Sequence, residues 1–294
     1  VKQADDQLKD FFSNRGKVYS ERTFHIPETG RANKGTLIQS VLNLEPNEYI
    51  TAALSVPNFE DTSGHFTMLT RNGRIKRVAL DEFAAVRPSG LIAMSLDGDD
   101  YLGWVKYSDG DQDIIIATDG GQSIRFHESE VRVMGRPAAG VMAIRLDDDR
   151  VAGMDVVDSE LHTHMLVVTA NGYGKRTELS EYRTQSRYGV GIRTLARNEK
   201  TGPIVGMRCI NSQDDILLIT RQGVVLRTNL EQIRETGRST QGVTIMNLAD
   251  GDAIVGLAIM SSGEPVPGEM VDATDADGAN ETNNAPTTSS SFQP

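Results

Sequence analysis

Ser212–Leu248 reads SQDDILLITRQGVVLRTNLEQIRETGRSTQGVTIMNL, and this stretch decides the fold. Two short runs rich in β-branched and aliphatic residues flank Arg221-Gln222-Gly223, which predicts a β-hairpin. A polar loop that contains Arg238 follows and ends at Gly242, before a second apolar run.

The same pattern occurs five times, and an internal repeat limits the fold more than any single element does. The hairpin glycines are Gly16, Gly73, Gly121, Gly172 and Gly223, and the loop arginines are Arg31, Arg87, Arg136, Arg187 and Arg238. Each glycine precedes its arginine by 14 or 15 residues, and the last three units are spaced by 51 residues. This regularity predicts five copies of one structural unit.

Each unit is expected to hold about four strands. In the third unit we expect them at Ile114–Thr118, Ser123–Phe126, Gly140–Leu146 and Val151–Val157. A lone four-stranded blade cannot bury both of its faces, so the units must stack, as in an all-β propeller-like disc of about five blades. The Asn-Gly pairs at two hairpins predict type I′ turns.

The amino-acid composition changes after residue 260 and divides the chain into a domain and a tail. Residues 1–260 form the predicted propeller domain, and residues 261–294 are acidic, rich in small polar residues and expected to be disordered. The net charge is −11, and the tail holds six acidic residues and no Lys or Arg. A polyanion would therefore have to bind a locally basic surface.

Three further features bear on the compartment of the protein and on whether the chain is part of a longer one. The single cysteine, Cys209, excludes a disulfide framework and favours a reducing compartment. The longest apolar run is too short to cross a bilayer, so no membrane association is expected. The chain does not begin with Met, and we expect it to be a piece of a longer protein.

The arginine loops are the strongest functional signal. A guanidinium beside small residues suits phosphate oxygens, and an arc of such loops would follow a DNA backbone without reading bases. The candidate DNA-binding residues are Arg31, Lys34, Arg87, Arg136, Arg187 and Arg238 in the loops, and Arg15, Lys17, Arg74, Lys76, Arg77, Lys175 and Arg176 on the hairpins.

Two alternatives remain open. The loop arginines could instead pair with carboxylates of the neighbouring blade, in a propeller that binds protein. A propeller enzyme would need inward-facing carboxylates or histidines in phase, and we find no such set. His162 with His164, and the run Asp147–Asp149, lack the spacing of a metal site. We therefore expect no catalytic residue and no metal on this chain.

The units resemble blades of the C-terminal domain of the DNA gyrase A subunit. The resemblance rests on Ser13–Tyr19 (SNRGKVY), Val131–Arg136 (VRVMGR) and Asn171–Thr177 (NGYGKRT), and it extends over about residues 11–260. The topoisomerase IV subunit is a more divergent relative and fits less well. The family's signature loop Q-R-R-G-G-K-G is absent, and the nearest string, Gly30–Gly35, resembles the loop of a second blade.

The resemblance implies a β-pinwheel, usually of six blades, in which neighbouring blades exchange a strand. It implies that double-stranded DNA wraps around the outer edge and that the whole enzyme introduces negative supercoils. The implied partners are the gyrase A N-terminal catalytic region and the gyrase B subunit, in an A2B2 enzyme of the bacterial cytoplasm, associated with the nucleoid. ATP and magnesium would be used elsewhere in that enzyme, and no cofactor is expected on this chain.

Overall fold

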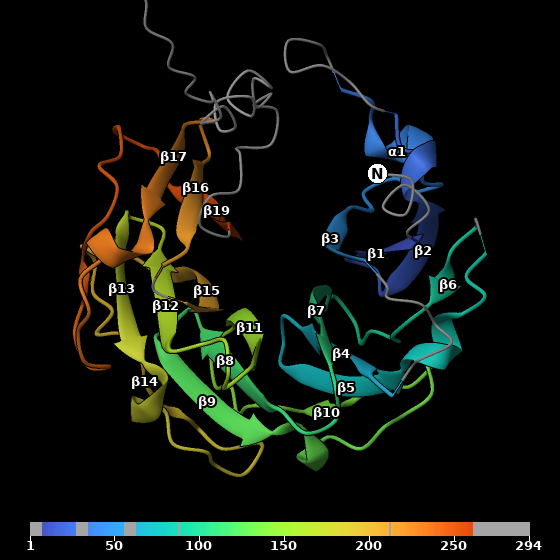
Figure 1. Cartoon of the computed structure of the whole chain (residues 1–294), viewed down its shortest axis with the longest axis horizontal. Coiled ribbons are helices and arrows are strands. Elements are labelled where there is room, and N and C mark those ends of the chain that lie inside the picture. Colours follow the sequence, from blue (N-terminus) through green and yellow to red (C-terminus); the bar gives the residue numbers. More distant parts are fainter. Residues whose placement is uncertain (1–7, 28–34, 56–62, 88, 212, 261–294) are drawn as a thin grey trace, which may run out of the picture.

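The five sequence units form five antiparallel β-sheets, which Figure 1 shows as blades in an open arc. The computed structural model describes residues 8–27, 35–55, 63–87, 89–211 and 213–260. The all-β propeller-like fold expected from the repeat is confirmed. The acidic segment 261–294 lies outside the described residues, as do Arg31 and Lys34.

Blades one to five follow chain order, and the strands of each blade run from the inner edge of its sheet to the outer edge. Blade one holds β3 (Ile50–Ser55), β1 (Leu8–Ser13), β2 (Lys17–Arg22) and β6 (Leu91–Ile92). Blade two holds β7 (Leu102–Ser108), β4 (His65–Thr70), β5 (Arg74–Ala79) and β10 (Val141–Met142). Blade three holds β11 (Val151–Val157), β8 (Asp113–Thr118), β9 (Gln122–His127) and β14 (Ile192–Arg193). Blade four holds β15 (Ile204–Ile210), β12 (His164–Thr169), β13 (Tyr173–Glu178) and β18 (Val243–Thr244). Blade five holds β19 (Ile254–Met260), β16 (Asp215–Thr220) and β17 (Val225–Asn229).

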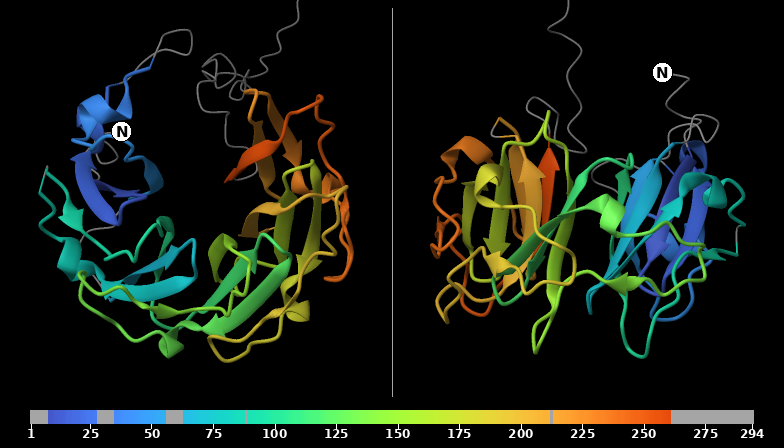
Figure 2. Two further views of the ribbon diagram at one scale, coloured as in Figure 1. Left: turned by 180° about the vertical axis from the view of Figure 1, so that it is seen from behind. Right: turned by 90° about the horizontal axis from the view of Figure 1, so that it is seen from below.

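Every blade follows one plan. A hairpin lies in the middle, a long strand from the same unit pairs on its inner side, and the inner strands of successive blades contact one another around the centre. The outer strand of blades one to four comes from a later unit in the chain, so β6 pairs with β2 and β10 pairs with β5. This exchange links each blade to its successor, as the resemblance implied. Figure 2 shows from behind and from below how the connecting loops cover the outside of the arc.

The expected third strand, Gly140–Leu146, is wrong in its length and its partner. Only Val141 and Met142 are in strand conformation, and they pair with the preceding blade. The same two-residue donation recurs at β6, β14 and β18. Within the described residues, blade five has three strands, because β17 has no donated neighbour.

The hairpin turns differ from the type I′ prediction. Among the described turn residues only the glycines have positive φ, for example 85° at Gly73 and 82° at Gly172. Their N–H groups bond to the carbonyl oxygens of Thr70 and Thr169, three residues earlier. This is the pattern of a type I turn followed by a left-handed glycine. The asparagines therefore need no positive φ, and the glycine alone sets the geometry.

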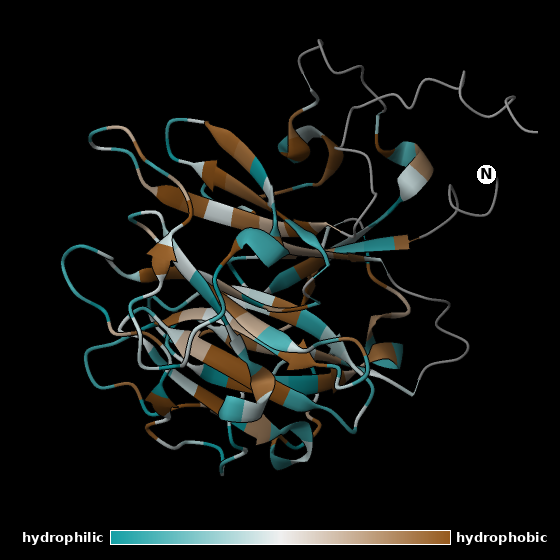
Figure 3. Cartoon of the chain, turned by 60° about the vertical axis from the view of Figure 1, so that its left-hand side comes forward, coloured by the Kyte–Doolittle hydropathy of each residue, from teal (hydrophilic) through white to brown (hydrophobic). Residues whose placement is uncertain are grey.

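Apolar side chains fill the space between blades. The rings of Phe12 and Phe66 meet edge to face at 5.1 Å, and Phe66 meets Phe83 at the same distance, which joins blades one and two. The short helix α1 (Ile38–Val41) and Leu42 cover Phe11 and Tyr19 on the other side of blade one. Figure 3 shows the apolar stretches on the strands and the hydrophilic ones on many of the loops. No helix in the described part of the chain is long and apolar enough to cross a membrane.

Short 3-10 turns end the hairpins and direct the chain toward the neighbouring blade. They are η1 (Thr23–His25), η3 (Leu80–Phe83), η4 (Glu128–Glu130), η5 (Leu179–Glu181) and η6 (Leu230–Gln232).

Candidate nucleic-acid interface

The candidate interface is built from crossing loops, which follow the last four 3-10 turns and run along the outer rim of the preceding blade (Figure 1). Three of them are fixed by parallel β-bridges to that blade, between Arg77 and Val133, Arg125 and Thr184, and Arg176 and Glu235. Each loop then ends in the donated outer strand. The loops therefore repeat in space with the blades, as the sequence spacing predicted.

The glycine that ends each of the last three crossing loops is required by a close backbone contact. At Gly242 φ is 78°, and an added Cβ would lie 2.6 Å from the carbonyl oxygen of Gly174 in the preceding blade. Gly140 and Gly191 meet their preceding blades in the same way. These glycines therefore accommodate the neighbouring blade.

Three loop arginines each face a glutamate of the preceding unit. The pairs are Arg136 with Glu82, Arg187 with Glu130, and Arg238 with Glu181. Arg136 Nε lies 3.3 Å from its carboxylate, whereas Arg187 and Arg238 donate their backbone N–H groups at 2.7 and 3.1 Å. Arg187 Nη1 also donates to the carbonyl oxygen of Met142, and Arg238 Nη1 to that of Arg193. These half-buried arginines therefore link blades, which is the alternative that the sequence left open.

Arg87 is different, and the sequence explains why. The position that holds glutamate in later units is occupied in the first unit by His25, which pairs with Glu21 instead. Arg87 is exposed, and its guanidinium has no hydrogen bond or ion pair to any described residue. It is the one of the four described loop arginines whose guanidinium remains available.

Two of the hairpin lysines lie inside the fold. Lys76 and Lys175 are fully buried, so the expectation that they contact DNA needs correction. The ammonium of Lys76 donates to the carbonyl oxygens of Gly135, Arg136 and Ala138, in the loop of the next unit. Burial lowers the pKa of Lys76 to about 8. Lys175 makes the equivalent contacts in the loop that carries Arg238.

The two hairpin arginines next to these lysines also contact the next unit. Arg77 is 6% exposed and donates to the carbonyl oxygen of Val131 at 2.7 Å and to the carboxylate of Glu128 at 2.7 Å. Arg176 is half-buried and donates to the carbonyl oxygen of Ile233 at 2.7 Å. Neither guanidinium points freely to the surface, so their assignment as DNA contacts also needs correction.

The remaining hairpin cations are partly exposed and ion-paired. Arg15 and Lys17 both bind Glu45, at 2.6 and 2.5 Å. The hydrogen bond from Lys17 is the main cause that lowers the pKa of Glu45. Arg74 lies 2.8 Å from Asp97. Because these pairs are open to solvent, a phosphate could compete for their cations at little cost.

A second in-phase set of arginines was not among the predicted DNA contacts. Arg132, Arg183 and Arg234 recur at intervals of 51 residues and are exposed. None of their guanidinium groups has a hydrogen bond or ion pair within the described part of the chain. The signal was present in the sequence, since each arginine directly follows an apolar residue, Val131, Tyr182 or Ile233. We call these three residues the rim arginine row.

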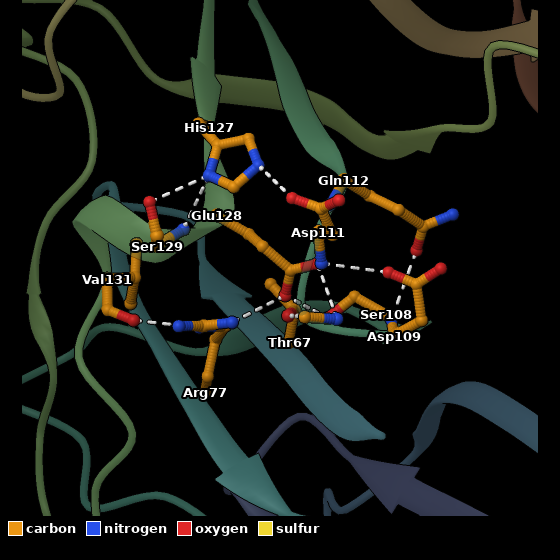
Figure 4. A network of polar contacts seen from close by, with 11 residues as sticks. Thr67, Arg77, Ser108, Asp109, Asp111, Gln112, His127, Glu128, Ser129 and Val131 are labelled. Carbon is orange, nitrogen blue, oxygen red and sulfur yellow. Dashed lines mark hydrogen bonds and ion pairs between the residues drawn. The ribbon is translucent and has the colours of Figure 1, made fainter. Parts of the chain in front are cut away.

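One blade boundary contains a buried polar network, shown in Figure 4. The Glu128 carboxylate accepts hydrogen bonds from Arg77 and Ser108 at 2.7 Å each, and from the backbone N–H groups of Gly110 and Gln112. Burial raises its pKa, but the hydrogen bonds from Ser108 and Arg77 outweigh burial, so the pKa lies below its ordinary value. Leucine occupies the equivalent positions 80, 179 and 230. The network therefore joins blades two and three only.

The weaker sequence candidates have local contacts. His162 Nδ1 accepts from the backbone N–H of Asp158, and His164 Nε2 bonds to Glu235 at 2.9 Å. In the acidic turn, Asp149 accepts from the N–H of Gly120 at the hairpin tip. Asp252 does the same for Gln222. The described residues contain no group of three or more His, Cys, Asp or Glu side chains that could hold a metal ion.

Comparison with known families gives a consistent result. The family model described as DNA gyrase C-terminal domain, beta-propeller, matches five times, at residues 11–57, 65–104, 112–158, 163–211 and 214–259. These five matches correspond to the five units of the repeat.

Relatives with high sequence similarity are much longer proteins. The chain is 40% identical over 245 residues to the DNA gyrase A protein of Staphylococcus epidermidis, which covers 83% of this chain and 27% of that protein. It is 39% identical over 248 residues to the DNA gyrase A protein of Haloquadratum walsbyi, covering 83% of this chain and 29% of the relative. The chain thus spans less than a third of these relatives.

Two solved structures share the fold. The C-terminal domain of a DNA topoisomerase IV matches with a TM-score of 0.80 at 24% identity, covering 88% of this chain and 80% of that one. A DNA gyrase A C-terminal domain matches with a TM-score of 0.76 at 24% identity, covering 87% and 83%.

Proposed function

The chain belongs to the DNA gyrase C-terminal domain family, and from this premise we propose that it binds double-stranded DNA along its outer rim through sequence-independent phosphate contacts. The observation that carries the proposal is the recurrence of arginines on the crossing loops of successive blades. Guanidinium groups bind phosphate oxygens through paired N–H donors. Contacts to the backbone position a duplex without reading its bases.

The acidic overall charge is compatible with this proposal because the charges are arranged locally. Several carboxylates on the rim are already engaged, as Glu82 and Glu181 are by loop arginines. Arg87 and the rim arginine row have no such partner among the described residues. The outer rim can therefore attract a polyanion although the chain carries a net charge of −11.

Within a longer protein, we assign this chain to DNA wrapping. Bending a short duplex costs on the order of 1–6 kcal/mol, so a wrap needs several phosphate contacts to offset the cost. An arc of blades with one cationic loop each supplies such contacts at regular intervals. Wrapping would support ATP-dependent negative supercoiling together with a gyrase A N-terminal region and a gyrase B subunit in an A2B2 assembly. ATP and magnesium would act in that remainder, in the cytoplasm and on the nucleoid.

A topology assay tests this function. The purified chain is incubated with nicked circular DNA, ligase closes the nick, and the linking number of the product is measured. Wrapping predicts a shift in linking number that grows with protein concentration. A product identical to that of DNA ligated alone, together with absence of duplex binding at low salt, would overturn the proposal.

The same assay bears on the choice between gyrase and topoisomerase IV. Sequence identity to gyrase A proteins supports the gyrase assignment. A gyrase domain should give a pronounced and concentration-dependent shift in linking number. Binding of duplex without any such shift would favour the topoisomerase IV alternative.

A protein-binding propeller is the second candidate. The observation that favours it is that Arg136, Arg187 and Arg238 are used to link blades. A protein-binding module would show no duplex affinity at about 50 mM salt. A DNA-binding chain should instead lose affinity steeply with salt, with a slope of log K against log salt of about −0.9 for each phosphate contacted.

A further inference from the structure

The rim arginine row is placed by its buried neighbours. Val131, Tyr182 and Ile233 are at most 2% exposed and anchor the start of each crossing loop in the core. The residue after each anchor is exposed on the outer side. Because successive residues of an extended segment point to opposite sides, burial of the anchor directs the arginine outward.

The backbone next to the row is fixed to the preceding blade. Two residues after each arginine, a backbone N–H donates to the carbonyl oxygen of a hairpin arginine. The three bonds are Met134 to Arg77 at 2.9 Å, Gln185 to Arg125 at 2.8 Å, and Thr236 to Arg176 at 3.0 Å. The row is therefore held in the same position on three successive blades, so less ordering is required when a ligand binds.

The two carboxylates that lie two residues before a row arginine are engaged by the next unit. Glu130 lies two residues before Arg132, and its carboxylate accepts the N–H of Arg187 from the next unit. Glu181 lies two residues before Arg183 and is engaged by Arg238 in the same way. The corresponding residue before Arg234 is Gln232, which carries no charge. Each of these blades thus presents one exposed guanidinium that no described carboxylate binds.

From this division we infer that Arg132, Arg183 and Arg234 make the phosphate contacts, whereas Arg136, Arg187 and Arg238 position the loops that carry them. The inference rests on the proposed function and assigns its contacts to residues that the loop-arginine pattern did not include. The ligand is the regularly repeating phosphodiester backbone of a duplex. One cation per blade, at a repeated position, suits a polymer with a regular charge repeat.

The second unit provides a variant that gains a contact. Its residue after the buried anchor Phe83 is Ala84, which is exposed and interrupts the row. Ala84→Arg adds a guanidinium at the equivalent sequence position, just after a 3-10 turn that is one residue longer than in the later units, without removing any existing side-chain hydrogen bond. If the row contacts phosphates, this single substitution extends it by one blade.

The test measures duplex affinity as a function of salt for matched variants of the full chain. The row variant is R132Q/R183Q/R234Q, and the positioning variant is R136Q/R187Q/R238Q. The control R150Q/R197Q/K200Q removes the same charge from exposed residues at the turns beside the hairpin tips. Urea unfolding is measured for each variant.

The row variant should lose about 2.7 from the magnitude of the salt slope, at about 0.9 per contact, with an unchanged unfolding midpoint. A84R should gain about 0.9. The positioning variant should lower the unfolding midpoint. The control loses only exposed contacts, of Arg150 with Asn72 and of Lys200 with the Tyr173 ring, so it should leave the slope unchanged and alter the midpoint less than the positioning variant.

If the wild type shows no duplex binding, the proposed function itself fails. If the wild type binds and the row variant keeps its slope, or A84R gains nothing, only this inference fails. An equal loss of slope in the control would show that total charge, rather than the row, determines binding, and would also overturn it.

Discussion

The ammonium group of Lys175 lies 2.6 Å from the carbonyl oxygen of Arg238, a residue of the next unit in the chain. It also donates to the carbonyl oxygen of Gly237 at 2.7 Å and to the hydroxyl of Thr240 at 3.3 Å. A lysine from one hairpin therefore fixes the crossing loop of its neighbour. Lys76 does the same for the loop that carries Arg136, so blade geometry and rim geometry are coupled.

Replacing Lys175 with methionine should therefore destabilise the domain. The substitution keeps the apolar stem but leaves buried acceptors without a donor, which costs roughly 1–3 kcal/mol. Urea unfolding should show a lower midpoint. Lys200→Met, which removes an exposed contact with the Tyr173 ring and no buried hydrogen bond, should lower the midpoint less. Equal midpoints for the wild type and K175M would contradict the conclusion that Lys175 fixes the crossing loop of the next unit.

The burial of Lys175 also predicts that the stability of the domain depends on pH. Burial lowers the pKa of Lys175 to about 8 from 10.5, with the Glu181 charge opposing it. Between these values the unfolded chain binds more protons than the folded chain, so this lysine contributes stability that increases as pH rises from about 8 to 10.5. The stability of the wild type relative to K175M should increase over this range. A difference that is constant with pH, or that shrinks, would refute the assignment.

The sequence predicted the repeat correctly because the repeat depends on local constraints. A glycine such as Gly121 must adopt positive φ in a turn, and Gly140 must approach a backbone closely. Both requirements select glycine, so glycines recur at a fixed spacing in the sequence. The strand expected at Gly140–Leu146 was wrong in length and partner because Val141–Met142 pairs with the preceding unit, and strand length depends on that tertiary pairing.

The assignments of Lys76, Lys175, Arg77 and Arg176 as surface cations needed correction for a related reason. A lysine at a hairpin position is ordinarily exposed, and no local pattern shows that three carbonyl oxygens of the next unit accept hydrogen bonds from Lys76. The sequence does show that units three to five carry two in-phase arginines each. Only the structure distinguishes Arg136, which is tied to Glu82, from Arg132, which is exposed.

The buried pair of Glu128 and Arg77 should be strongly coupled. Glu128→Leu introduces the residue of units two, four and five but leaves Arg77 buried without its carboxylate, and we expect a loss of about 3–5 kcal/mol in unfolding free energy. The double variant R77M/E128L should recover part of this loss, because it removes the unpaired guanidinium but still leaves the N–H groups of Gly110 and Gln112 without their acceptor. Additive losses in a double-mutant cycle, measured by urea unfolding, would show that the two groups act independently.

Replacing the buried carboxylate of Asp10 should stabilise the domain. Asp10 is fully buried, and burial raises its pKa to about 6, although a hydrogen bond from Ser20 opposes the shift. A raised acid pKa gives stability that is present below pH 3.8 and lost as pH rises through 6. Asp10→Asn should therefore raise the unfolding free energy at pH 7 by roughly 3 kcal/mol, and by little at about pH 4. The exposed control Asp148→Asn should change neither value, and a D10N variant less stable than wild type at neutral pH would oppose this account.

Removing residues 261–294 should strengthen duplex binding. The segment carries six acidic residues and no Lys or Arg, so the truncation changes the formal net charge from −11 to −5. Repulsion between this charge and DNA phosphates is screened over about 10 Å at 0.1 M salt. The gain in affinity should therefore be largest at low salt and should fade as salt rises. A full-length variant with the six acids changed to Asn or Gln separates charge from chain length, and it should match the truncated chain. If the truncated chain binds more tightly but the neutralised variant does not, the effect comes from the presence of the segment rather than from its charge.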